Sequence, residues 1–400
     1  MGPVKPLKVP LMLGVEGVAG INHKAQLMMA TPRETVWRIE PHTEAKHLIL
    51  REYLKAWFPI LGQIQGRVLY LDGFCGPGQY SEGEDGSPLI ALKTAARYHQ
   101  RFKEEVVFYF IDEDCKRIEY LKSLIESFGR LSKFRIHTEC NEFEYVLSHE
   151  LDKLESEGLH IAPTFAFIDP FGFSGLPMRL IHRLLAHPRT EAFINFNANN
   201  INRFVEHPNE HIRNSIIDLF GTDDVLEVIR DSENRFRDLR ELYQRQLRLA
   251  AEYVRFFSMT DMNRRPIYDL FFAGNNDEGH YRMKEAMWKA DPEQGVQFSD
   301  ATDPTQSVLF KAEPAKLLLR FMLRAYEGQR KVAVDEIRNW VRDHTAFLNT
   351  HATAALIVGQ EDGQLTVNPP TKDGRPRRRF GSKYSVDFTK GRGIQTRLFS

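Results

Sequence analysis

Residues 68–78 read Val-Leu-Tyr-Leu-Asp-Gly-Phe-Cys-Gly-Pro-Gly. The first four are apolar, and an apolar run of this length bounded by glycines is typical of a parallel strand buried on both faces. The run ends in an acid and a glycine-rich turn, which contains Asp72, Gly73, Phe74, Gly76 and Gly78. Glycines there let the backbone approach a ligand at the carboxyl end of the strand. The stretch predicts a nucleotide-type site, although glycine turns also follow strands that bind nothing.

The residues after this turn distinguish between cofactors. A dinucleotide fingerprint has a third glycine where this chain has Ser81, and the next helix begins late, with Ser87 as its cap and Pro88 in its first turn. A helix that starts this far from the turn is poorly placed to bind a pyrophosphate. Asp72 would repel phosphate but would pair with a cationic amino acid group. These features favour S-adenosylmethionine (SAM) over NAD.

Apolar runs alternate with helical segments along the chain, which predicts a parallel sheet with right-handed crossovers. Two later apolar runs are joined directly and indicate an antiparallel hairpin. The expected strands are residues 68–71, 106–111, 134–137, 164–168 and 192–196, followed by 254–259 and 267–272. We therefore predict an α/β protein with the Rossmann-like fold of SAM-dependent methyltransferases, a parallel sheet that ends in an antiparallel hairpin.

Polar residues at the strand ends are the candidate site residues. Asp112 ends the second strand, where an acid binds ribose hydroxyls in Rossmann-type sheets, although it also suits a solvated helix cap. Asn141 follows the third strand and is predicted either to read the adenine edge or to form a turn. The fourth strand ends in a second motif, which we call the reaction turn and which consists of Asp169, Pro170, Phe171 and Gly172.

Length and charge predict two domains in a chain without a strong overall field. The chain has 400 residues, with 54 basic and 54 acidic side chains. Residues 365–400 nevertheless carry nine Lys or Arg against two Asp, a net charge of +7, so the remainder carries −7. We expect a flexible N-terminal arm at 1–30, a methyltransferase-like domain at 31–300 with a helical insertion at about 208–250, and a winged-helix domain at 307–392.

The cysteines and the hydropathy pattern suggest where the protein works. Cys75, Cys115 and Cys140 match no zinc spacing and suggest no pairing, which predicts a reducing, cytoplasmic setting and no metal site. No apolar run approaches the roughly twenty residues of a membrane span, so we expect no membrane partner.

The predicted C-terminal domain consists of three helices and a basic hairpin, which is a winged-helix pattern. Such domains place a helix in the major groove and basic loops on phosphates. The residues predicted to contact nucleic acid are Lys372, Arg375, Arg377, Arg378, Arg379 and Lys383. Two other interpretations stay open, because charge runs often lie in solvated loops and winged helices often dock proteins.

Four groups of residues resemble the three-Cys-motif partner (TcmP) family over residues 31–290. They are Trp37 with Pro41-His42-Thr43 and Lys46, the turn from Asp72 to Gly78, residues 86–91, and the reaction turn. From spacing alone, His42 and Lys46 are predicted to be capping or solvent-exposed groups. The chain differs from the family in having Asp112 where glutamate is common, and in its long arm before Thr31.

The resemblance implies a methyltransferase-like protein and a three-Cys-motif partner protein encoded nearby. The Asp-Pro-Phe-Gly motif is also similar to the reaction motif of tRNA guanine dimethyltransferases, which methylate an exocyclic amine. By this similarity, Asp169 and the Pro170 carbonyl would accept hydrogen bonds from the target amine and position it for methyl transfer. Phe171 would stack on an extruded base of DNA or tRNA.

Two other functions compete with this prediction. A methyltransferase-like scaffold without catalysis would dock a partner protein through its winged helix and would not need Asp169. An NAD oxidoreductase is disfavoured by Ser81 and by the absence of an obvious hydride-relay His or Tyr motif.

Overall fold

The computed structural model describes residues 34–63, 66–129, 131–172, 175–204, 209–301, 313–371, 373 and 375–388. The chain divides into two compact units, the first formed by residues 1–290 and 297–303 and the second by residues 291–296 and 304–400. The arm predicted at residues 1–30 lies outside the described residues.

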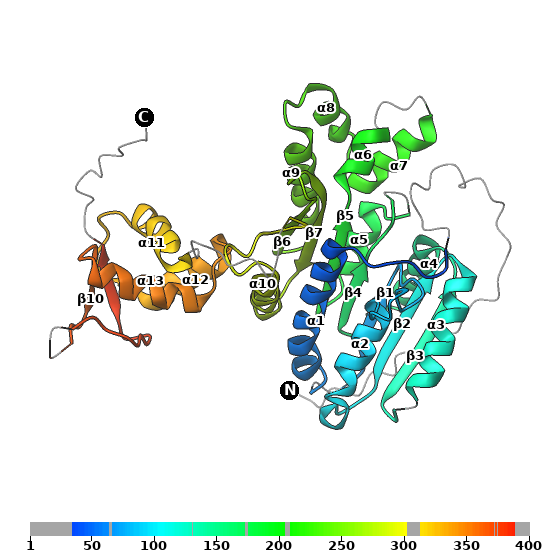
Figure 1. Ribbon diagram of the computed structural model, residues 1–400, viewed down its shortest axis with the longest axis horizontal. Coiled ribbons are helices and arrows are strands. Elements are labelled where there is room, and N and C mark those ends of the chain that lie inside the picture. Colours follow the sequence, from blue (N-terminus) through cyan, green and yellow to red (C-terminus); the bar gives the residue numbers. More distant parts are fainter. Residues whose placement is uncertain are drawn as a thin grey trace. The chain divides into compact units, whose positions relative to one another are not determined.

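An eight-stranded sheet forms the centre of the first unit, in the order β3-β2-β1-β4-β5-β7-β6-β8. Strands β1 to β5 are parallel, and β7 is antiparallel to both β5 and β6 (Figure 1). The strands are β1 (Val68–Asp72), β2 (Val106–Asp112), β3 (Phe134–Cys140), β4 (Thr164–Ile168), β5 (Thr190–Phe196), β6 (Tyr253–Thr260), β7 (Pro266–Gly274) and β8 (Gln297–Ser299). The predicted fold class is confirmed, and the short parallel strand β8 is an addition that the sequence did not predict.

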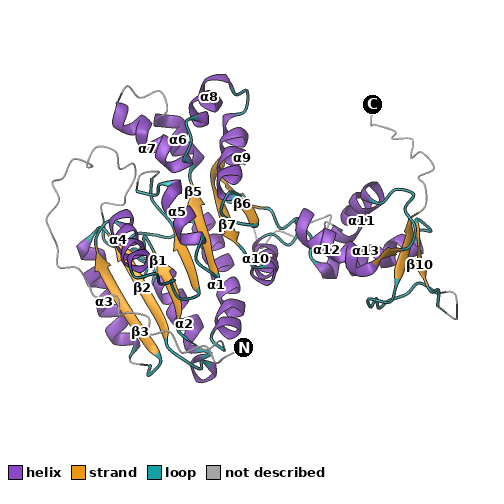
Figure 2. Cartoon of the chain, turned by 180° about the vertical axis from the view of Figure 1, so that it is seen from behind, coloured by secondary structure: helices purple, strands orange, loops and turns teal. Residues whose placement is uncertain are grey.

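Helices cover both faces of this sheet (Figure 2). They are α1 (Pro41–Leu61), α2 (Ser87–Ala96), α3 (Cys115–Phe128), α4 (Phe143–Ser156), α5 (Met178–Leu185), α6 (Ala198–Phe204), α7 (Glu210–Phe220), α8 (Asp224–Asp231), α9 (Arg235–Leu247) and α10 (Asp277–Ala290), with a short 3-10 turn at His99–Arg101. Pro41 and Pro88 begin α1 and α2 without a loss of hydrogen bonding, because the first N–H groups of a helix have no partner within it.

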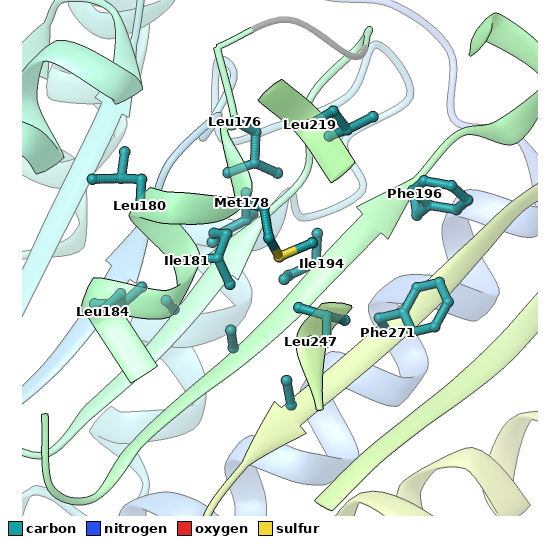
Figure 3. Close-up of a cluster of buried hydrophobic side chains, with 14 of the residues drawn as sticks. Leu176, Met178, Leu180, Ile181, Leu184, Ile194, Phe196, Leu219, Leu247 and Phe271 are labelled. Atoms are coloured by element: carbon teal, nitrogen blue, oxygen red, sulfur yellow. The ribbon is translucent and has the colours of Figure 1, made fainter. Parts of the chain in front are cut away.

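Two apolar cores form because successive side chains of a strand point to opposite faces. Leu69 and Leu71 of β1 belong to the core under α4, α5, α7 and α9, whereas Val68 and Tyr70 belong to the core under α1, α2, α3 and α10. Figure 3 shows part of the first core, where side chains of α5 meet Ile194 of β5 and Phe271 of β7. Burial on both faces explains the continuous apolar runs of the sequence.

Strand order places a ligand crevice at one point of the sheet. The chain winds outward from β1 through β2 to β3, and then returns to the other side of β1 with β4. In open α/β sheets, ligands bind outside the carboxyl ends of the strands where the winding direction reverses. The carboxyl ends of β1 and β4 carry the glycine-rich turn and the reaction turn, so topology brings these two motifs together.

A buried carboxyl group lies near the opposite end of β5. Glu191 accepts a hydrogen bond from the hydroxyl of Tyr53, and burial raises the pKa of Glu191 from 4.5 to about 7. The folded state therefore holds a proton that the unfolded chain releases between these two values, so stability falls as the pH rises through this window.

Replacing this carboxyl group should flatten the pH dependence of stability. We expect Glu191→Gln, which keeps an acceptor for Tyr53, to remove a loss of about 3 kcal/mol that the wild type shows between pH 4 and pH 8. Urea unfolding at pH 5, 6, 7 and 8 measures it. Parallel curves for the two proteins would show that Glu191 titrates normally in the folded state.

The cysteine prediction is wrong, because Cys115 and Cys140 form a disulfide with their Cα atoms 5.1 Å apart. Cys115 begins α3 and Cys140 ends β3, and the register of β2 with β3 places Cys140 opposite Asp112. The pair is 25 residues apart in sequence and is brought together only by the sheet. Cys75 is buried and free. The cytoplasmic setting, which we inferred from unpaired thiols, loses that support and stays a prediction.

The second unit contains three helices and a three-stranded antiparallel sheet in the order β10-β11-β9. Its elements are α11 (Pro314–Ala325), β9 (Val332–Ala333), α12 (Val334–His344), α13 (Asn349–Glu361), β10 (Leu365–Asn368) and β11 (Ser385–Phe388). Tyr326 stacks on Phe388 with the ring centroids 5.1 Å apart, which ties α11 to β11. Among the helices that the structure describes in both units, none has the length and apolar character needed to cross a bilayer.

Candidate active site

A cavity of about 410 Å³ lies at the carboxyl ends of β1, β4 and β5. Its wall combines both sequence motifs with residues from α1, from the end of β5 and from β7. Of the predicted site residues, the cavity wall includes Phe74, Gly76, Gly78, Asp169, Pro170 and Phe171. The structure therefore brings the glycine-rich turn and the reaction turn to one cavity.

Both carboxylate oxygens of Asp169 are engaged. Oδ2 forms an ion pair with the ammonium of Lys46, and Oδ1 accepts a hydrogen bond of 2.7 Å from Nδ2 of Asn195. The Lys46 ammonium also lies 5.4 Å from the ring centroid of Tyr268. Lys46 is buried, so its side chain is exposed neither to bulk solvent nor as a cap.

His42 is likewise buried, and the prediction that His42 and Lys46 are solvent-exposed is wrong for both residues. The two ring nitrogens of His42 lie 3.0 Å from carboxylate oxygens of Glu40 and Asp300. Burial lowers the pKa of His42, but hydrogen bonds to these two carboxylates outweigh it and the net shift is upward. The His42 carbonyl accepts a hydrogen bond of 3.2 Å from the hydroxyl of Tyr268, which ties the start of α1 to β7.

Phe171 packs in an aromatic cluster at the cavity wall. Its ring centroid is 5.8 Å from that of Trp37, and the guanidinium of Arg117 lies 5.0 Å from Trp37 and 5.2 Å from Phe171. The carbonyl of Phe171 accepts a hydrogen bond of 3.2 Å from Asn200. A base that stacks on Phe171 would therefore join an existing cluster, and Gly172 lies outside the cavity wall.

The glycine-rich turn contributes backbone to the cavity. Gly76 has a φ of +61°, and a Cβ there would face Trp37 at 3.8 Å. Gly78 has a φ of +84°, and a Cβ there would collide with Leu121 of α3 at 2.6 Å. Gly76 thus keeps the turn open toward the cavity, whereas Gly78 permits close packing of the turn on α3. Gly73 lies behind the wall, where its N–H donates to the Phe167 carbonyl at 3.0 Å.

Asp72 lies directly behind the turn and is fully buried. Burial raises its pKa to about 7, against hydrogen bonds that favour the charged form. Oδ2 accepts a hydrogen bond of 3.3 Å from Tyr70, and Oδ1 has no hydrogen-bond partner among the described residues. Asp72 does not belong to the cavity wall, although its neighbour Ser87 does.

Asp112 and Asn141 also lie outside the cavity wall. The oxygens of Asp112 accept hydrogen bonds of 2.9 Å from the backbone N–H groups of Gly76 and Asp114. Asn141 accepts a hydrogen bond of 2.9 Å from the N–H of Glu142 ahead of α4. Asp112 thus supports the glycine-rich turn, and Asn141 has the contacts of a turn residue, which is the alternative that the sequence left open.

Residues that the sequence did not assign complete the wall. They include His47, Tyr80, Asn195, Asn197, Asn200 and Tyr268. Their only signal in the sequence is position, since the asparagines follow or end the apolar run of β5. Among the described residues, no group of three or more His, Cys, Asp or Glu side chains is arranged to hold a metal ion.

The basic residues of the second unit differ in their contacts. Arg377 lies 4.1 Å over the ring of Tyr384 and donates to the Tyr384 hydroxyl at 3.0 Å and to the Pro369 carbonyl at 3.1 Å. Arg378 pairs with Glu361 at 2.9 Å, and Arg375 lies 3.7 Å from Asp373. Arg379 and Lys383 are exposed, and Lys372 lies outside the described residues. Arg377 therefore supports the hairpin itself.

Neither the protein-family models nor the curated proteins contain a match to this chain. Among solved structures, the chain is similar to geranyl diphosphate methyltransferase in complex with SAM. The two are 13% identical, and the match covers 59% of this chain and 85% of that chain with a TM-score of 0.25. At this TM-score the likeness supports no conclusion about this chain.

Proposed function

We propose that this protein is a SAM-dependent methyltransferase that acts on an amino nitrogen of a nucleic-acid base. The observation that carries the proposal is the meeting of two motifs at one cavity. A glycine-rich turn after β1 and an Asp-Pro-Phe-Gly turn after β4 share a wall where the winding of the sheet reverses. The volume of about 410 Å³ lies within the range of small-molecule sites.

The residues at this cavity fit SAM in two respects. The backbone at Gly76 faces the cavity without a side chain, and Asp72 behind it keeps one buried oxygen without a partner in the described part of the chain. Gly76 and Gly78 would hold the methionine end of SAM with support from Asp72, and Asp112 would hold the ribose after rearrangement of its present contacts. Bound SAM supplies an electrophilic methyl group on a sulfonium.

The wall also suits an amine on a flat ring. Phe171 and Trp37 offer ring faces and edges, and the Pro170 carbonyl and three asparagines offer uncharged hydrogen-bonding groups. A base held here would have its amine near the reaction turn, so catalysis would come mainly from positioning. The exposed basic residues of the second unit would hold the phosphates of DNA or tRNA if this unit acts as a winged helix.

One observation favours the scaffold alternative, in which a three-Cys-motif partner protein docks to a methyltransferase-like protein without catalysis. Asp169 has no free oxygen, since Lys46 and Asn195 engage both. A scaffold would tolerate this arrangement, whereas an enzyme that uses Asp169 as the acceptor must first displace one of these partners.

Cofactor binding tests the proposal directly. We expect S-adenosylhomocysteine (SAH) to raise the melting temperature, because a ligand that binds only the folded state stabilises it by mass action. An increase of a few degrees at about 100 times the Kd corresponds to roughly 2.7 kcal/mol. Differential scanning calorimetry with SAH and with NADH measures the shift. A shift with NADH alone would refute the cofactor assignment.

A further inference from the structure

The amide of Asn195 has a fixed orientation. Its Nδ2 lies 2.7 Å from Oδ1 of Asp169, and the other oxygen of Asp169 is paired with the Lys46 ammonium. A carboxylate in an ion pair only accepts hydrogen bonds, so the NH₂ group of Asn195 must face it. The orientation of an amide is often ambiguous, but here the hydrogen-bond network decides it. Oδ1 of Asn195 therefore points away from Asp169.

This oxygen is an acceptor without a donor. Oδ1 of Asn195 is shielded from water and has no hydrogen-bond partner among the residues that the structure describes, although the Asn195 side chain belongs to the cavity wall. Leaving a buried acceptor unpaired costs about 1–3 kcal/mol, and buried polar atoms in folded proteins are nearly always paired. A ligand that brings an N–H group to this position would recover that cost.

We propose that the target amine donates a hydrogen bond to Oδ1 of Asn195, and that Lys46 and Asp169 are positioning residues that hold this oxygen in place. The inference rests on the proposed function and changes the role of one residue, because Asp169 then orients Asn195 instead of touching the substrate. During transfer, the nitrogen lone pair forms a bond to the methyl carbon as the carbon–sulfur bond breaks. The electron pair of that bond goes to sulfur, and the nitrogen loses a proton to water.

Lys46 controls the charge of Asp169 in this arrangement. The titratable groups around Asp169 come from several elements: Lys46 of α1, Tyr70 and Asp72 of β1, Tyr80 of the following turn, and Tyr268 of β7. Lys46 is the one cation in this set of described residues. Without it, Asp169 would bind a proton more readily and would become a donor. A protonated Asp169 would attract Oδ1 of Asn195, so the amide would turn its NH₂ group toward the substrate.

Nucleosides that differ only at an amine test the acceptor. Calorimetric titrations would compare adenosine with inosine and cytidine with uridine, with SAH present to block the cofactor site. We expect at least one amine-bearing nucleoside to bind about 10-fold or more tightly than its oxo counterpart, because an unmatched acceptor costs the oxo compound a hydrogen bond. Asn195→Leu should abolish this preference. Equal binding within both pairs to the wild type, or an unchanged preference in Asn195→Leu, would overturn the inference.

The role of Lys46 is tested by the pH dependence of the same preference. In Lys46→Met we expect the preference for the amine to be lost at pH 6 and regained toward pH 9, where Asp169 ionises and the amide returns. Lys46→Arg keeps the positive charge and should behave like the wild type at both values. A preference in Lys46→Met that does not change with pH would mean that Lys46 only supports the fold and that the positioning role is wrong.

These outcomes are separate from the fate of the proposed function. If SAH does not bind, methyl transfer from SAM is refuted, and the amine preference is still measured without SAH. If SAH binds and labelled methyl groups reach tRNA or DNA, but Asn195→Leu retains both rate and preference, only the inference about Asn195 is refuted.

Discussion

Asp169→Ala should reduce methyl transfer by about 100-fold or more while leaving the affinity for SAM nearly unchanged. The substitution removes the group that orients Asn195 and anchors Lys46, and these contacts matter for positioning the amine in the transition state. Transfer of a labelled methyl group onto tRNA and onto duplex DNA gives the rate, and calorimetry with SAH gives the cofactor affinity. Equal losses of binding and turnover would mean that Asp169 holds the cofactor or the fold.

Asp169→Asn separates two roles for the same residue. If Asp169 itself accepted the hydrogen bond of the amine, the amide oxygen of an asparagine would retain part of that function. If Asp169 orients Asn195, the new oxygen would face Lys46 and the new NH₂ group would face Asn195, which then turns its own Oδ1 inward. In that case we expect Asp169→Asn to lose nearly as much activity as Asp169→Ala.

Folding must be controlled in this series, because either substitution leaves the Lys46 ammonium buried without its partner. Breaking a buried ion pair by removing one member costs about 3–5 kcal/mol. The double variant Lys46→Met with Asp169→Ala has no unpaired charge at this position and should regain much of the thermal stability. If it also regained methyl transfer, the loss in the single variant would be a folding effect.

The fold could be predicted from the sequence because its signals are local. Each strand is an apolar run bounded by turn residues, and the order of runs and helices restricts the topology to a parallel sheet with a hairpin. The strand β8 was missed because its three residues, Gln297–Ser299, form no apolar run and pair with β6 only after the sheet exists.

The candidate site was predicted where function depends on backbone and missed where it depends on register. The two turns follow their strands directly, so their meeting at one cavity follows from strand order. The Lys46–Asp169 pair joins residues 123 positions apart, and the sequence shows only a lysine on the apolar face of a helix. The disulfide between Cys115 and Cys140 depends in the same way on the pairing of β2 with β3.

The basic hairpin of the second unit should give the other large effect, on nucleic-acid binding. We expect a variant with Arg375, Arg378, Arg379 and Lys383 changed to glutamine to bind duplex DNA and tRNA more weakly. The logarithmic salt dependence should flatten by up to about four units, close to one for each phosphate that the variant no longer neutralises. The weakening should be uniform across sequences, since phosphate contacts carry no sequence information. Arg377 is left unchanged because it stacks on Tyr384 and bonds to the Pro369 carbonyl.

Matched controls make this result specific to the hairpin. Arg320→Gln with Arg324→Gln changes two exposed cations of α11 in the same unit, and it should leave the salt dependence nearly as in the wild type. A single Arg377→Gln change should instead lower the melting temperature, because it removes interactions that support the hairpin. SAH affinity should stay constant in all three variants, since the glycine-rich turn belongs to the first unit. If the wild type binds neither duplex DNA nor tRNA in a salt-dependent way, the hairpin has no phosphate partner, and docking of a protein becomes the better account of the second unit.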